Sequence, residues 1–222
     1  MTQLSTELVA VLQNFATINP NFVFDSDKPL GTISPTKSIV AQYTGNVDVF
    51  PEEFSTYGIY DLNEFLTALS LAGDSTQLDF SEKSVSISGD DGSVEYFFSR
   101  RETLNVSVVS INMPAEDLQF TITQAQLTQL KKASSVFGHK KVRFSSEGST
   151  VTARVCDPAN ATAPSFSLTI DGARSTSNVD FVLDIDNFKL VKGDYAVTYA
   201  KQGITLFDNP SVDMRYWIAV EK

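Results

Sequence analysis

Two hydrophobic periods alternate along the chain, and each marks a different kind of element. In two segments apolar residues recur at positions i, i+3, i+4 and i+7, as do Leu8, Val11, Leu12 and Phe15 in the first of them, and a third segment has Leu127, Leu130 and Phe137 on one side. This spacing places the apolar side chains on one face of a helix. The pattern predicts helices over residues 5–17, 62–71 and 124–137.

Residues at the ends of these segments support the predicted boundaries. Asp61 and Thr123 stand where an N-cap is needed, and Gly138 follows the last apolar residue of the third helix. A fourth, very short helix is predicted over residues 187–191, ending before Gly193. The chain therefore favours two helices in each half.

Between the helices the period changes from 3.6 to 2, which is typical of antiparallel strands with one solvated face. The runs 84–88 and 150–155 alternate in this way, and hairpin turns are indicated at 90–92, 147–149 and 201–203. Loops are expected at 157–165 and 172–178. Further strands are predicted at 39–43, 57–60, 94–98, 166–170, 179–183, 195–199 and 215–220.

The order of elements in the first half recurs loosely in the second. The run Asp61-Leu62-Asn63-Glu64-Phe65 has a counterpart in Asp184-Ile185-Asp186-Asn187-Phe188. We expect an α+β protein of two similar domains, 1–105 and 119–222, joined by an ordered connector over 106–118. The alternative is that two unrelated α+β units share a common pattern.

Few residues are suited to cofactor or metal chemistry. The single cysteine, Cys156, cannot form an internal disulfide, and the single histidine, His139, follows a helix-ending glycine. The paired carboxylates at 90–91 and at 184 and 186 are explained by turns and capping. No cofactor is expected. The opening residues lack the pattern of a signal peptide, so a soluble cytoplasmic protein is expected.

Charge is distributed unevenly along the chain. The formal net charge is −10, and residues 1–100 contain fourteen acidic against four basic residues. Residues 101–160 contain seven basic against five acidic residues. Lys131 and Lys132 lie on the polar side of the third predicted helix, whose residues Leu127, Leu130 and Phe137 are expected to face inward. A local basic surface is compatible with a polyanionic partner.

Two stretches resemble the sliding clamps of T-even-type tailed phages, the processivity factors of DNA polymerases. They are Leu12-Gln13-Asn14-Phe15-Ala16-Thr17-Ile18-Asn19 and Ile59-Tyr60-Asp61-Leu62-Asn63-Glu64-Phe65-Leu66. The resemblance implies a homotrimeric ring with two DNA-clamp domains per chain, helices lining the hole and antiparallel sheets outside. It implies sequence-independent contact with double-stranded DNA through phosphates. The DNA-facing residues would be Lys131, Lys132, Lys189, Lys192, Lys140, Lys141 and Arg143.

The resemblance also implies a pocket that receives the peptide tail of a DNA polymerase, and edge-to-edge joining of subunits. The pocket wall would comprise Val40, Tyr43, Val47, Val108, Ile111, Trp217 and Ile218. The subunit interface would place Tyr96, Phe97 and Phe98 beside Ser165, Phe166, Ser167 and Leu168.

The clamp interpretation implies no enzymatic activity, loading by an ATPase clamp loader, and action in the cytoplasm of an infected bacterial host. Partners in transcription are compatible with it. Two alternatives remain open on the sequence: a virion structural protein of a tail or neck ring, and an enzyme. The lysines of the third helix distinguish a clamp from a virion structural protein, because a structural ring does not need them.

Overall fold

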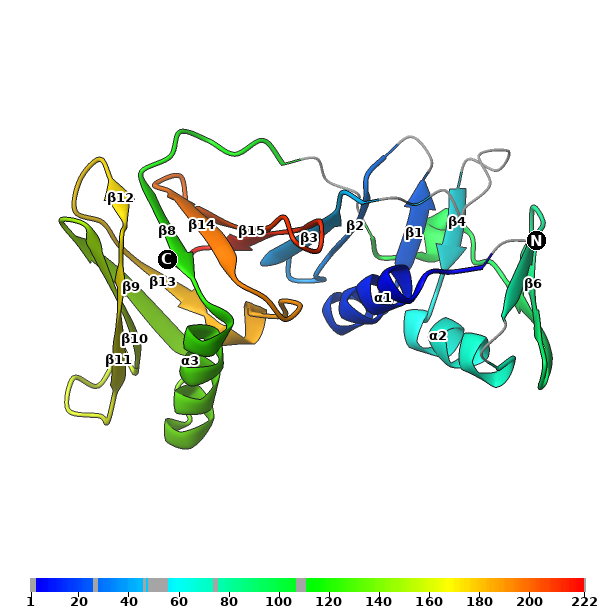
Figure 1. Ribbon diagram of the computed structural model, residues 1–222, viewed down its shortest axis with the longest axis horizontal. Coiled ribbons are helices and arrows are strands. Elements are labelled where there is room, and N and C mark those ends of the chain that lie inside the picture. Colours follow the sequence, from blue (N-terminus) through cyan, green and yellow to red (C-terminus); the bar gives the residue numbers. More distant parts are fainter. Residues whose placement is uncertain are drawn as a thin grey trace. The chain divides into compact units, whose positions relative to one another are not determined.

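The computed structural model describes residues 3–25, 28–45, 47, 56–73, 76–106 and 111–221. The chain forms two compact units. Unit 1 consists of Met1–Thr36 with Val40–Val109, and unit 2 of Lys37–Ile39 with Ser110–Lys222. Each unit combines helix with antiparallel strands (Figure 1), which confirms the α+β class. The boundary between Val109 of unit 1 and Ser110 of unit 2 falls within the predicted connector, 106–118. Residues 107–110 of the connector lie outside the described residues.

Unit 1 begins with a helix that is followed by strands, a second helix and a meander of three strands. Its helices are α1 (Thr6–Ile18), α2 (Leu62–Leu71) and the 3-10 helix η1 (Arg101–Thr103). Helices α1 and α2 pack against each other (Figure 1). The strands are β1 (Phe22–Asp25), β2 (Leu30–Ile33), β3 (Ile39–Tyr43), β4 (Thr56–Ile59), β5 (Gln77–Phe80), β6 (Ser84–Gly89) and β7 (Gly92–Phe97).

Aromatic side chains fill the core of unit 1. Tyr57 on β4 is 1% exposed and has three aromatic neighbours, at ring-centroid distances of 5.8 Å for Phe24, 5.3 Å for Phe80 and 4.8 Å for Phe98. Offset and edge-to-face contacts of this kind add to the gain from burial itself. These rings connect β1 and β4 with the meander of β5, β6 and β7.

A buried asparagine connects three segments of unit 1. Asn19, the C-cap residue of α1, is 2% exposed. Its Nδ2 donates to the carbonyl oxygens of Ile33 at 2.8 Å and Asn105 at 3.0 Å, and its Oδ1 accepts from the backbone N–H of Asn21 at 3.0 Å. All three groups would be left without partners by an apolar side chain here.

Unit 2 contains one α-helix, α3 (Gln124–Phe137), in its described part, with a 3-10 helix, η2 (Ile185–Asn187). Strands β11, β10, β9 and β13 form one antiparallel sheet in that order. Strands β12, β8, β14, β15 and β16 lie side by side in that order in a second sheet. The strands are β8 (Leu118–Ile122), β9 (Lys141–Glu147), β10 (Thr150–Cys156), β11 (Phe166–Asp171), β12 (Arg174–Ser175), β13 (Asp180–Asp184), β14 (Tyr195–Ala200), β15 (Ile204–Asn209) and β16 (Met214–Ala219).

A row of aromatic rings joins the two sheets of unit 2. Phe144 on β9 stacks on Phe181 of β13 at 5.1 Å, and Phe181 stacks on Tyr199 of β14 at 4.1 Å. Phe120 on β8 lies 5.8 Å from Phe144. All four side chains are buried, so the inner faces of the sheets form one core.

Helix α3 begins and ends where the sequence predicts. The hydroxyl oxygen of Thr123 accepts from the backbone N–H of Gln126, and the side-chain oxygen of Gln126 accepts from the backbone N–H of Thr123. Gly138 ends the helix in the left-handed region at φ 72°. The predicted inward position of Phe137 is wrong. Ala133 is buried in the helix with Leu127 and Leu130, whereas Phe137 is 37% exposed.

The predicted helix over 187–191 is absent, and the 3-10 turn η2 precedes it. Asp184 caps η2 as Asp61 caps α2, with its side chain accepting from a backbone N–H of the first turn. A longer helix after Ile185 and Phe188 would place Lys189 and Lys192 on the buried face, where α2 has leucines. The apolar stripe ends there, and the helix ends with it.

Every segment that the alternation predicted as a strand is a strand in the structure, with ends shifted by at most two residues. The hairpin turns at 90–92, 147–149 and 201–203 also connect strands as predicted. The expected loop at 172–178 differs, because it contains β12. The predicted strands did not include β1, β2, β5 or β8, which are short. Strands β1 and β2 are largely buried on both faces, so they show no alternation.

Candidate functional site

The exposed side of α3 presents two adjacent lysines. Lys131 and Lys132 are both exposed, while Leu127 and Leu130 anchor the other side of the helix in the core. In the described part of the chain neither lysine makes an ion pair with a carboxylate. Desolvation by surrounding atoms lowers the pKa of Lys131. Because neither ammonium is held by a carboxylate, both are available to a phosphate.

The other basic residues predicted to face DNA in this region have acidic partners. Lys141 lies 2.9 Å from carboxylate oxygens of both Asp184 and Glu221. Arg143 donates from Nε to both oxygens of Asp180 at 2.8 and 2.9 Å. A phosphate that contacts these side chains must compete with carboxylates already in place.

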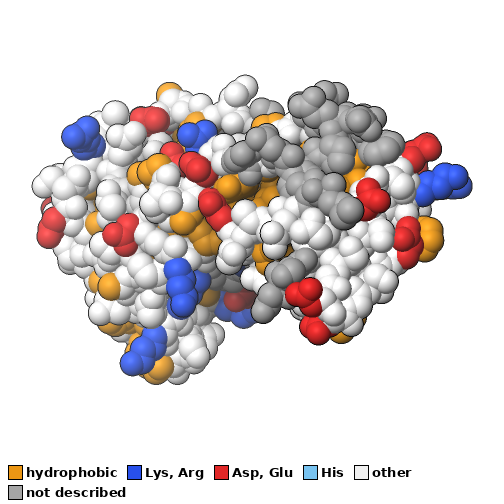
Figure 2. All heavy atoms as spheres, turned by 45° about the vertical axis from the view of Figure 1, so that its right-hand side comes forward, with side chains coloured by type: hydrophobic (Ala, Val, Ile, Leu, Met, Phe, Trp, Pro, Cys, Tyr) orange, Lys and Arg blue, Asp and Glu red, His pale blue; other side chains and the backbone are white. Residues whose placement is uncertain are grey.

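Lys140 follows the same rule, since it pairs with Asp186. This pairing raises the pKa of Lys140 through a hydrogen bond and the charge of Asp186. Lys189 is half-buried and Lys192 is exposed, and both lie in the irregular segment after η2. Figure 2 shows basic and acidic side chains scattered singly over the coloured part of the face that it presents. The ion pairs thus distinguish the α3 lysines from Lys140, Lys141 and Arg143.

Strand β7 is an edge strand of the sheet that it forms with β6 and β5. Successive side chains point to opposite faces of a strand. Tyr96 turns inward, since its hydroxyl donates to the Asp61 carbonyl at 3.4 Å, and Phe98 contacts the buried Tyr57. Phe97 lies between them and is 69% exposed. Of the three interface residues predicted on or next to β7, Phe97 is the one that presents its ring to solvent.

The other side of the predicted subunit interface includes β11, which is the edge strand of its sheet and pairs with β10. Ser167 is exposed, and Phe166 and Leu168 are half-buried. Ser165 precedes the strand and accepts from Arg154 at 2.9 Å. Phe166 also lines an open groove of about 330 Å³ beside the exposed end of α3, with Val136, Phe137 and Lys132.

The residues predicted for the partner pocket come from both units. Val40 and Tyr43 are buried and Val47 is half-buried in unit 1, Ile111 is half-buried in unit 2, and Val108 lies outside the described residues. Their assembly into one pocket stays a prediction.

On β16 the structure separates two of the proposed pocket residues. Trp217 and Ile218 are successive residues, so they point to opposite faces of the sheet. Ile218 is 0% exposed and lies opposite Thr205 on the core side. Trp217 is 7% exposed, and its buried Nε1 has no hydrogen-bond partner among the residues that the structure describes. Trp217 therefore lies on the outer face of the strand, the face that also contains the exposed Arg215.

Other kinds of site find little support. The described residues contain no group of three or more His, Cys, Asp or Glu side chains that could hold a metal ion. Among the helices that the structure describes, none has the length and apolar character needed to cross a membrane.

Two α+β units of helices and antiparallel sheets give the chain the fold of proliferating cell nuclear antigen. A crystal structure of that antigen from Entamoeba histolytica matches with a TM-score of 0.70 at 13% identity, covering 97% of this chain and 95% of that one. The PCNA2–PCNA3 complex from Sulfolobus tokodaii matches with a TM-score of 0.63 at 13% identity, over 97% of this chain and 96% of the other. These likenesses concern the fold.

Sequence comparison identifies the family. The chain is 30% identical to the sliding clamp of Vibrio phage KVP40 over 99% of both chains. It is 23% identical to that of Escherichia phage RB69, over 88% of this chain and 86% of the relative, and 25% identical to that of Enterobacteria phage T4, over 99% and 96%. No family model matches the chain. This protein belongs to the phage sliding-clamp family, and the virion structural alternative is not supported.

Proposed function

We propose that three copies of this chain close into a ring around duplex DNA, each joining the next through β7 of one copy and β11 of its neighbour. The observation on which this depends is the pair of open strand edges. An unpaired edge exposes backbone N–H and C=O groups, and pairing removes two such edges at each joint. Phe97, exposed beside one edge, would become buried in the assembly.

Within the ring, α3 supplies the proposed contact with DNA. Lys131 and Lys132 would approach phosphates without reading base sequence. Lys192 and Lys189 would add weaker contacts. Lys140, Lys141 and Arg143 would contribute less, because Asp186, Asp184, Glu221 and Asp180 already hold them. Weak phosphate contacts suit a ring that slides, since closure rather than affinity retains it.

The ring would tether a DNA polymerase through a peptide that packs on the outer face of β16, the face that contains Trp217. The remaining pocket residues are those predicted from the sequence. An ATPase loader would open the ring on DNA, and the clamp itself would catalyse no reaction. The place of action would be the cytoplasm of the infected bacterial host.

The test of the ring is the solution mass measured by light scattering over a dilution series. We expect a species near three times the 24.3 kDa of the chain, which dissociates on dilution. The variant Phe97→Asp should remain monomeric, because it would place a carboxylate in the joint.

A matched control is Tyr60→Asp, which changes another exposed aromatic residue of unit 1 that does not belong to β7. It should remain trimeric. A wild-type chain that is monomeric at every concentration would contradict the ring. A trimer that Phe97→Asp leaves unchanged would retain the ring and reject this joint.

A further inference from the structure

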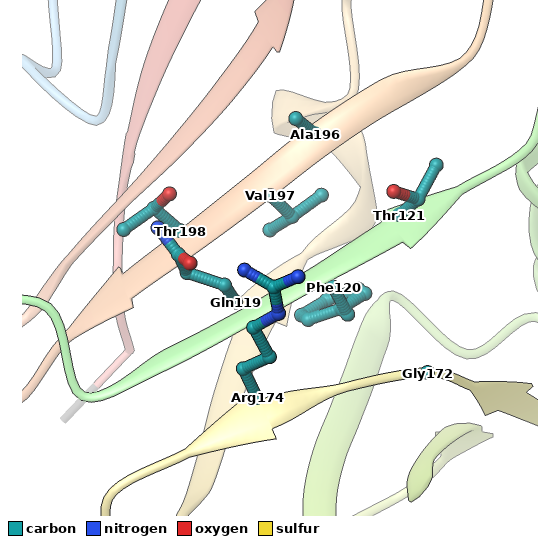
Figure 3. Close-up of a pocket in the computed structure, with 8 residues that line it drawn as sticks. All are labelled: Gln119, Phe120, Thr121, Gly172, Arg174, Ala196, Val197 and Thr198. Atoms are coloured by element: carbon teal, nitrogen blue, oxygen red, sulfur yellow. The ribbon is translucent and has the colours of Figure 1, made fainter. Parts of the chain in front are cut away.

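One face of the sheet in unit 2 contains an open pocket of about 270 Å³. Gln119, Thr121 and Thr198 line it from β8 and β14, Arg174 lines it from β12, and Gly172 lies at its border (Figure 3). This face is opposite the core, since the neighbouring residues Phe120 and Val197 are buried. None of the residues named in the preceding subsection for DNA, subunits or polymerase lines this pocket.

Arg174 differs from the other arginines of unit 2. Arg143 pairs with Asp180, Arg215 donates to Asp208 at 3.3 Å, and Arg154 donates to Ser165. The side chain of Arg174 makes no hydrogen bond or ion pair with any residue that the structure describes. In Figure 3 its side chain reaches from β12 over β8 toward Gln119.

The pocket places other hydrogen-bonding groups near this guanidinium. Arg174 lies opposite Gln119, and Gln119 lies opposite Thr198, in the strand register. Side chains opposite each other across antiparallel strands share a face at about 5 Å. Gln119 donates to Glu116 at 2.6 Å, which holds its side chain, while Thr121 and Thr198 offer hydroxyl groups. Two hydroxyl donors and a guanidinium fork suit a carboxylate.

The same row of the sheet leads to Trp217. Thr198 lies opposite Leu206 on β15, and Leu206 lies opposite Trp217 on β16. Four strand spacings therefore separate Arg174 from Trp217, a distance of about 19 Å at roughly 4.8 Å per spacing. An extended peptide covers that distance with about six residues at roughly 3.3 Å each.

We propose that the pocket at Arg174 binds a carboxylate side chain of the same partner peptide, about six residues from the group that contacts Trp217. This inference rests on the proposed function, because the peptide is the one by which a DNA polymerase would be tethered to the ring. A single exposed ion pair is weak in water, so a free acid would bind poorly. A peptide already held at Trp217 would present its carboxylate at a high effective concentration.

The pocket can be tested without any polymerase. The side-chain Nε–H resonances of the arginines, recorded by NMR on the full chain, would be followed during titration with the tripeptide Ac-Ala-Asp-Ala-NH2. The resonance of Arg174 should shift, and the Asn analogue should bind about fivefold more weakly, the ratio typical of one exposed ion pair. Equal shifts with the two tripeptides, or none with either, would overturn the proposal.

Three variants assign the response to this pocket. Arg174→Ala should abolish the shifts at the side-chain amide of Gln119, and Arg174→Lys should reduce them. Arg215→Ala, on the same sheet, should leave them unchanged and serves as the control for folding. Inorganic phosphate at equal concentration should shift Arg174 less than the Asp tripeptide; an equal or larger shift would overturn the assignment to a carboxylate.

The variant Trp217→Ala separates this inference from the proposed function. It should leave tripeptide binding intact while it weakens binding of the polymerase. Loss of tripeptide binding in Trp217→Ala would contradict an independent pocket at Arg174. Failure of the ring in light scattering would leave the tripeptide result unaffected.

Discussion

At the scale of single residues, buried polar groups determine much of the stability of unit 1. Asn19 belongs to one of the two stretches that resemble phage clamps, yet it is enclosed between α1, β2 and the segment at Asn105. Its amide connects backbone groups that are far apart in the sequence. The resemblance at this position is thus explained by folding rather than by contact with DNA.

We therefore expect Asn19→Ala to lower the free energy of unfolding by about 2–3 kcal/mol, because buried carbonyl and amide groups lose their partners. Urea unfolding followed by circular dichroism would measure it. Asn63→Ala, at an exposed position of α2, is the matched control and should change stability little. An equal loss in both variants would contradict the role of Asn19.

Asp117 provides the corresponding case in unit 2. Its Oδ2 accepts from the backbone N–H of Lys201 at 2.8 Å, and its Oδ1 lies 3.2 Å from the Lys201 ammonium. These contacts lower the pKa of Asp117, chiefly through the backbone hydrogen bond. Since the pKa is lower in the folded state than in the unfolded state, the charged carboxylate stabilises the fold above about pH 4.

The lowered pKa of Asp117 predicts how the stability of the fold changes as the pH falls. Asp117→Asn should unfold at lower urea concentration than the wild type at about pH 7, and the difference should shrink as the pH falls through the folded pKa. Urea midpoints measured between about pH 7 and pH 2.5 would test it. A difference that is constant over this range would show that the charge of Asp117 contributes nothing.

At the scale of elements, capping and periodicity specify the helices, and α3 shows both. Thr123 and Gln126 cap its start reciprocally, and its apolar stripe ends near Gly138. The helices that follow the two aspartate N-caps, Asp61 and Asp184, differ in length. After Asp61 the stripe continues through Phe65 and Leu69 and forms α2, whereas after Asp184 lysines interrupt it and η2 results.

The cap of α3 can be tested directly. Thr123→Ala should lower the free energy of unfolding by about 1 kcal/mol, because the backbone N–H of Gln126 loses its acceptor. Thr123→Ser keeps the hydroxyl group and should retain most of the stability. If Ser and Ala were equally destabilising at this position, the capping hydrogen bond would not be the cause.

At the scale of the whole molecule, the acidic net charge and the local lysines have different effects. A net charge of −10 disfavours nonspecific binding of DNA over most of the surface. Acidic side chains also hold Lys140, Lys141 and Arg143 in ion pairs. Lys131 and Lys132 are the exceptions among the basic residues of α3 and β9. Attraction to phosphates is thereby concentrated on one helix.

The double variant Lys131→Glu with Lys132→Glu should bind a labelled duplex at least about tenfold more weakly than the wild type. The slope of log K against log salt should fall by about 2, one for each phosphate that a lysine no longer neutralises. Lys28→Glu with Lys37→Glu changes the net charge equally and should bind almost normally. Equally weakened binding in the two double variants would indicate a general effect of charge, without a site on α3.

The chain by itself determined the local structure. Alternation gave the faces of β6 and β10, and the caps at Asp61, Thr123 and Gly138 set the ends of α2 and α3, because these features depend on residues close in sequence. The resemblance in two short stretches indicated the family before any fold was known. Local pattern was wrong for the inward position of Phe137 and at residues 187–191, where the cap was right and the apolar stripe was missing.

The tertiary structure decided which of these elements meet. Sheet order left β7 and β11 at edges, paired Arg143 with Asp180, and placed Arg174 beside Gln119 and Thr198. It also placed Ile218 in the core and Trp217 on the opposite face of β16. Hydrophobic periodicity records which side of a strand is buried, but not which strand lies next to it, because pairing depends on packing between distant segments.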